Sequence, residues 1–133
     1  MLFLLDTDIC IYIIKRKPQH VIDRFQTLSL SDIGVSSLTI AELEYGAYKS
    51  QRVEQNRAAL NQFLLPLEIV PFDESVTQIY GNLRATLERR GTIIGGIDML
   101  IASQAIALSL TLVTNNTKEF SRIQNLDLDN WVS

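Results

Sequence analysis

Short apolar runs that each end at a polar residue alternate along this chain with segments whose apolar residues recur at helical spacing. Strands are expected at 1–5, 33–36, 68–71 and 110–114, with an edge strand at 126–129. Helices are expected at 9–15, 18–28, 39–49, 53–65, 74–90, 97–108 and 118–123. Unbroken apolar strands that alternate with helices are typical of a buried parallel sheet. The pattern therefore predicts a three-layer α/β/α sandwich with a mostly parallel central sheet.

Composition narrows the class of protein further. The chain has 133 residues, of which 47% are hydrophobic, and contains no linker or repeat, so we expect one domain over residues 1–133. No apolar run reaches the roughly 18 residues that span a bilayer, which predicts no membrane segment. The apolar start lacks a basic region and is interrupted by Asp6 and Asp8, so no export signal is expected. These features favour a cytoplasmic protein.

Cysteine and histidine are too scarce for most soft metal sites. The single cysteine, Cys10, excludes an internal disulfide, and the single histidine, His20, excludes a two-histidine site. A Cys10–His20 pair is one interpretation, and a core cysteine with a surface histidine is the other. The formal net charge of −3 argues against a protein that simply coats duplex nucleic acid, although it is compatible with an acidic site inside a basic rim.

Acidic residues follow strands or begin helices at several places along the chain. Asp6 ends the first strand, Glu42 lies near a helix start, and Asp98 begins a very apolar helix. Each has a structural interpretation as well: Asp6 as a helix cap, Glu42 in a capping box with Thr39, and Asp98 as a charge favoured by a helix dipole. In parallel sheets, however, sites form where strands end.

Carboxylates that converge at one sheet edge repel one another unless a cation lies among them. Ligation by oxygen alone suits Mg²⁺, with Mn²⁺ as the second choice. Such an ion can orient a phosphate and activate water. The residues alone thus predict an acidic metal site that acts on a phosphate.

Four segments, taken in order, resemble the PIN-domain ribonucleases of the VapC toxin type. They are LLDTD, SSLTIAELEYGA, GTIIGGIDMLIASQA, and LVTNNTKEF followed by NLDLDNW, and they extend over essentially the whole chain. The resemblance implies Mg²⁺-dependent hydrolysis of RNA phosphodiester bonds. It also implies a cognate antitoxin that holds the enzyme inactive, and a homodimer.

The resemblance assigns roles to individual residues. It implies that Asp6, Glu42 and Asp98 hold the metal, and that Glu119 supplies a fourth acid where Asn116 occupies the usual acidic place and contacts metal-bound water or phosphate. Asp8, where the family often has Asn, is open as a water ligand, a ligand of a second ion, or a cap. The expected substrate contacts are the hydroxyls of Thr7 and Thr114 and the cations of Lys15, Arg16, Lys17, Lys49, Arg84 and Arg90.

Two alternatives to a nuclease toxin stay open from the sequence. A phosphatase of the haloacid-dehalogenase type would use Asp6 as its nucleophile, because a strand followed by Asp-x-Asp opens that family's motif. A PIN fold without activity that only binds a partner or RNA is the second alternative, and Asn116 is the feature that favours it.

Overall fold

A five-stranded sheet in the order β3-β2-β1-β4-β5 forms the centre of the structure, a computed structural model that describes residues 1–133. The strands are β1 (Phe3–Leu5), β2 (Ile33–Ser36), β3 (Glu68–Val70), β4 (Thr111–Val113) and β5 (Leu128–Asp129). All neighbouring strands pair in parallel, so the mostly parallel sheet predicted from the sequence is parallel throughout. The expected edge strand is present but short, and Leu128 pairs with Leu112.

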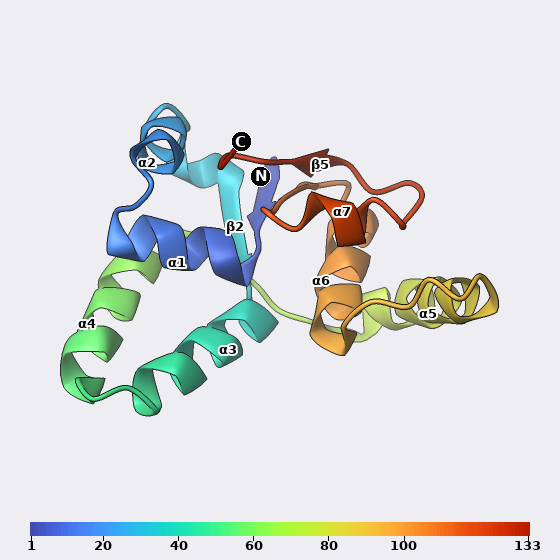
Figure 1. Cartoon of the computed structure of the whole chain (residues 1–133), viewed down its shortest axis with the longest axis horizontal. Helices are drawn as coiled ribbons and strands as arrows, with labels where there is room; N and C mark the ends of the chain where they lie inside the picture. Colours follow the sequence, from blue (N-terminus) through green and yellow to red (C-terminus); the bar gives the residue numbers. More distant parts are fainter.

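Helices cover both faces of this sheet (Figure 1). They are α1 (Thr7–Lys15), α2 (Gln19–Gln26), α3 (Ser37–Tyr48), α4 (Val53–Leu64), α5 (Thr77–Arg89), α6 (Gly96–Ala107) and α7 (Thr117–Phe120). Two 3₁₀ turns, η1 (Leu30–Asp32) and η2 (Glu74–Val76), precede β2 and α5. Helices α1 to α4 lie mainly on one side, and α5 to α7 lie on the other (Figure 1). The predicted three-layer sandwich is therefore confirmed.

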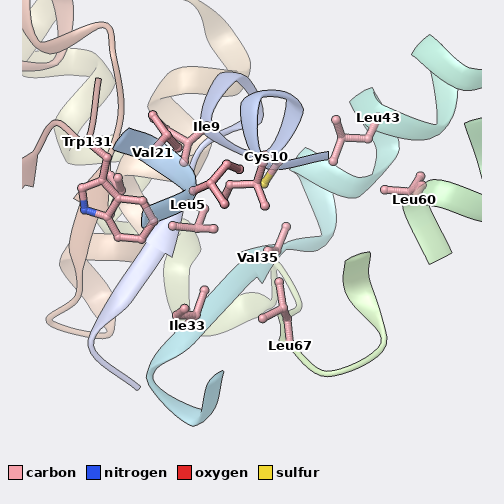
Figure 2. Packing of buried hydrophobic residues seen from close by; sticks show 13 residues of the cluster. Leu5, Ile9, Cys10, Val21, Ile33, Val35, Leu43, Leu60, Leu67 and Trp131 are labelled. Carbon is pink, nitrogen blue, oxygen red and sulfur yellow. The ribbon is translucent and has the colours of Figure 1, made fainter. Parts of the chain in front are cut away.

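Alternate side chains of the central strands β1 and β4 enter two separate cores. Leu5 of β1 and Val113 of β4 belong to a cluster of 13 buried residues with α1, α2 and α4, whose side chains Figure 2 shows. Their neighbours Leu4 and Leu112 belong to a cluster of 12 with α5, α6 and α7. Because successive strand residues point to opposite faces, the continuous apolar runs of the sequence supply both cores.

Capping side chains shift two helix starts relative to the sequence-based expectation. Helix α1 begins at Thr7 rather than residue 9, because Asp6 is its N-cap and accepts a hydrogen bond from the Ile9 amide. Helix α3 begins at Ser37 rather than residue 39, because the Ser36 hydroxyl accepts from the Leu38 amide. Asp6 is the first residue after β1, and Ser36 is the last residue of β2. Each cap therefore determines where a strand ends and where the next helix begins.

The single cysteine and the single histidine do not form a metal site. Cys10 is fully buried in the first core (Figure 2), and burial raises the pKa of its thiol. His20 is exposed and its ring contacts the carbonyl oxygen of Val132. The interpretation of a core cysteine with a surface histidine is therefore confirmed. No helix in the structure combines the length and apolarity that crossing a membrane requires.

Candidate active site

The predicted acids gather where the strand order reverses. Strand β1 lies between β2 and β4. The chain continues from β1 to β2 and β3 on one side of it, and then crosses to β4 and β5 on the other side. Asp6 directly follows β1, and Thr114 directly follows β4. In open parallel sheets the crevice at such a switch point is the usual ligand site. The sheet therefore places Asp6 at the position where chemistry is expected.

Asp6 is a buried carboxylate that caps α1 and lies near other acids. Its side chain caps α1 at 3.0 Å from the Ile9 amide nitrogen, and only 6% of the residue is exposed. Burial raises its pKa to about 6, while hydrogen bonds from Thr114 and Ile9 lower it and the charges of Asp8 and Asp98 raise it. Asp6 is therefore the helix cap that the sequence predicted, and the charges of neighbouring acids also raise its pKa.

Glu42 of α3 points toward α1. The hydroxyl of Thr7 donates a hydrogen bond of 2.6 Å to Glu42 Oε1. The predicted capping box of Thr39 and Glu42 is wrong, because α3 begins two residues before Thr39 and Ser36 caps it. The orientation that the sequence left open is therefore the one that faces the site.

Asp98 lies in the first turn of α6 and is half-buried. Burial raises its pKa to about 6, with further increases from the charges of Glu119, Glu42 and Asp8. A Cβ atom at Gly95 would lie 3.2 Å from Asp98 Oδ2, tighter than ordinary contact, so the glycine leaves room for this carboxylate. Three other acids therefore lie close enough to Asp98 for their charges to raise its pKa.

Glu119 is held by two donors from different segments. Asn116 Nδ2 donates to Glu119 Oε2 at 2.7 Å, and the Gly95 amide donates to Oε1 at 3.2 Å. These hydrogen bonds lower the pKa of Glu119. The Thr114 hydroxyl accepts from the Asn116 amide at 2.9 Å and so fixes the start of this turn. The structure brings Asn116 and Glu119 to the site, and Glu119 remains charged beside Asp98.

The donor set fits a hard divalent cation, although the side chains are not closed around one point. Carboxylate and amide oxygens are the ligands that Mg²⁺ and Mn²⁺ prefer. No three acidic, histidine or cysteine groups converge at ligating distance in this structure. Glu42 accepts a hydrogen bond from Thr7, and Glu119 accepts one from Asn116.

The six predicted basic contacts lie at different places in the fold. Lys15 ends α1 and lines a groove together with Glu42, and Lys49 follows α3. Arg84 on α5 donates hydrogen bonds to the Glu88 carboxylate at 2.9 Å and to the Tyr80 hydroxyl at 2.9 Å.

Three further cations were predicted as substrate contacts. Arg16 adopts the left-handed C-cap conformation after α1, Lys17 follows it, and Arg90 is the C-cap of α5. Of all six cations, Lys15 and Lys49 adjoin the helix that carries Glu42.

Sequence reasoning missed the part that Gly95 plays. Its amide donates to Glu119, and its missing side chain admits Asp98. The Gly-Gly pair at 95 and 96, directly before Ile97 and Asp98, was the available signal, and it was interpreted only as a break between helices. A glycine beside a candidate acid can thus mark space for that acid.

Comparison with known proteins places this geometry in a family. The PIN domain model matches residues 3–126. Ribonuclease VapC2 of Rickettsia felis is 49% identical over 132 residues, 98% of each chain. The tRNA(fMet)-specific endonuclease VapC of Salmonella typhimurium is 42% identical over 129 residues, 97% of each chain.

Solved structures agree with the sequence matches. The crystal structure of VapBC2 from Rickettsia felis bound to a DNA fragment from their promoter contains a chain that superposes with a TM-score of 0.92 at 48% identity, covering 98% of this chain and 99% of that one. These matches favour the nuclease interpretation over the phosphatase alternative. The chain belongs to the PIN domain family and, within it, to the VapC proteins.

Proposed function

We propose that this chain is a metal-dependent endoribonuclease that hydrolyses RNA phosphodiester bonds and acts as the toxin of a toxin–antitoxin pair. The observation that carries the proposal is the gathering of Asp6, Glu42 and Asp98 at the switch point of the sheet. The ribonuclease names of relatives over nearly the whole chain support it. An RNA substrate is in turn the reason to propose a cytoplasmic location.

Mg²⁺ is the proposed cofactor, with Mn²⁺ as a substitute, and Asp6, Glu42 and Asp98 are its proposed ligands. When bound, such an ion orients the scissile phosphate and makes water a better nucleophile. The raised pKa values of Asp6 and Asp98 are the cost of holding carboxylates together in a partly buried site. A dication at this place offsets that cost, which is the physical support for the metal.

Side chains around the acids orient them for this chemistry. Thr7 holds Glu42, and Thr114 hydrogen-bonds Asp6, so each hydroxyl restricts the rotation of one carboxylate. One of the carboxylates that hold the metal is the proposed proton acceptor. Thr7 and Thr114 are thus assigned as positioning residues as well as substrate contacts.

An antitoxin is the proposed protein partner, and the structure offers it an apolar groove beside the acids. Ile11 and Ile14 of α1 and Leu43 of α3 line a groove of about 320 Å³ that Glu42 also lines. An apolar segment in this groove can place an Arg or Lys side chain among the carboxylates, where a guanidinium pairs with two oxygens at once. The complexes of VapB with VapC from Rickettsia felis and Salmonella typhimurium support such a partner. A homodimer is also proposed.

The test is cleavage of a defined RNA by the purified full chain with Mg²⁺, compared with Asp98→Asn and Asp127→Asn. Asp127 is exposed at the opposite end of the sheet, so its variant controls for the loss of one charge. We expect Asp98→Asn to lose at least about 100-fold in rate and Asp127→Asn to retain it. Equal activity of all three chains contradicts the proposal. RNA binding by the native chain without cleavage in Mg²⁺ or Mn²⁺ supports the binding-module alternative instead.

A further inference from the structure

An exposed aromatic ring lies beside the acids on α3. Tyr45 is 66% exposed and follows Glu42 by three residues. Helix geometry places it about 60° around the axis and about 4.5 Å along it from Glu42. Because helical side chains lean toward the N-terminus, the ring leans toward the turn that carries Glu42. Tyr45 does not line the apolar groove.

A cation lies against this ring. Lys49 Nζ is 4.9 Å from the centroid of the Tyr45 ring. Lys49 follows Glu42 by seven residues, which returns it to within about 20° of the same helix face. It forms no ion pair with a carboxylate within 4.0 Å, and neither does Lys15, which lines the groove together with Glu42. Their charges are therefore free for a polyanion.

Tyr48 differs from Tyr45 in its direction relative to Glu42 and in the cation at its ring, although it is 60% exposed on the same helix. Six residues after Glu42, it is turned about 120° from it around the axis. The cation over its ring is Arg57, at 5.1 Å, and Arg57 is paired with Glu44 at 3.1 Å. Its cation is thus already neutralised, and the ring faces away from the acids.

Flat rings beside unpaired cations are the combination that binds single-stranded nucleic acid. Bases stack on the ring whatever their sequence, and cations contact the backbone. In a chain of net charge −3, a polyanion that approaches four carboxylates requires such local cations. An apolar peptide is better suited to the neighbouring groove, more than half of whose lining residues are hydrophobic.

We propose that Tyr45 and Lys49 form an RNA subsite in which Tyr45 stacks on a base next to the scissile phosphate and Lys49 contacts the adjoining phosphate. The ligand is a single-stranded stretch of RNA, so a loop or an unpaired end is the substrate element that fits. This inference rests on the proposed ribonuclease function and adds how the RNA lies across α3.

The experiment measures binding and stacking separately from cleavage. The full chain with Asp98→Asn is titrated into a single-stranded RNA oligonucleotide that carries 2-aminopurine, whose fluorescence falls when it stacks. We expect Tyr45→Ala in this background to weaken binding roughly 5- to 100-fold and to abolish the quenching. Tyr45→Phe should keep both, because the ring remains. Tyr48→Ala is the matched control and should leave both unchanged.

Lys49→Ala tests the phosphate contact through salt dependence. For single strands, removing one contact should lower the slope of log affinity against log salt by about 0.7, with the quenching retained. If Tyr45→Ala binds like its parent, or if Tyr48→Ala loses as much, the subsite is wrong while the proposed function stands. If the native chain neither cleaves nor binds RNA, both fail. Loss of antitoxin binding by Tyr45→Ala with unchanged RNA binding assigns the ring to a protein interface and overturns the inference.

Discussion

Thr7 and Glu42, which are 35 residues apart in the sequence, are joined by a hydrogen bond of 2.6 Å that links α1 to α3. This bond keeps a charged side chain at the sheet edge in one rotamer before any ligand arrives. Its contribution can be measured, because valine has the shape of threonine without the hydroxyl.

Thr7→Val should lower the rate of RNA cleavage about 10- to 100-fold, the usual effect of losing a group that orients a metal ligand. Thr7→Ser keeps the hydroxyl and should retain most of the activity. The measurement is single-turnover cleavage at saturating Mg²⁺. An unchanged rate in Thr7→Val would show that Glu42 needs no orientation.

Asp98→Asn should raise the melting temperature in metal-free buffer by roughly 2–5 °C, because it removes one of several repelling charges while it keeps the shape. Asp6→Asn should act in the same direction and still cap α1, since asparagine is also a good cap. Thermal unfolding in EDTA tests both. A lower melting temperature for Asp98→Asn would mean that its charge stabilises the fold.

Stability without metal should fall as the pH rises through the range from about 4 to 7. Asp6 and Asp98 have pKa values raised from 3.8 to about 6, so the folded chain holds these protons more tightly than the unfolded chain does. Their contribution is therefore fully present at low pH and is lost as the carboxyls ionise. Melting temperatures at pH 5 and pH 7.5 in EDTA should show the decrease, and the double variant Asp6→Asn/Asp98→Asn should show a smaller one. Saturating Mg²⁺ should restore stability at pH 7.5.

Glu119→Gln should weaken metal affinity more than Asn116→Ala does. A neutral amide cannot replace the attraction of a carboxylate for a dication, whereas loss of Asn116 removes only one of the two donors to Glu119. A calorimetric Mn²⁺ titration of each variant gives the comparison. The reverse order would mean that the amide of Asn116, and not the charge of Glu119, is the important fourth group.

Inhibition by the antitoxin should depend on a basic side chain. Because Glu42 lines the proposed antitoxin groove, a basic side chain of a bound segment can pair with it, so Arg→Ala or Lys→Ala variants of the partner should inhibit less and compete less well with Mn²⁺. The assay is RNA cleavage with purified partner variants. Full inhibition after removal of every basic residue from the inserted segment would leave steric cover of the RNA path as the mechanism.

The sequence predicted the position of Asp6 and the parallel sheet, because strand ends and apolar runs are local features. It could not predict that Ser36 rather than Thr39 caps α3, since both are good caps and the choice depends on where β2 ends. The bridge from Gly95 to Glu119 joins segments 24 residues apart, and no local pattern encodes it. The Arg84–Glu88 ion pair, by contrast, has the i,i+4 spacing that is readable from the sequence.

The acids at the sheet edge come from positions 6, 42, 98 and 119. A ribosome that synthesises about 5–20 residues per second needs roughly 6 to 23 s between the first and the last of them. Throughout that interval the nascent polypeptide carries only part of this set of acids. Premature termination anywhere before the last acid therefore yields fragments without a complete centre, and a cell that makes this protein has the whole of its synthesis time to supply whatever restrains it.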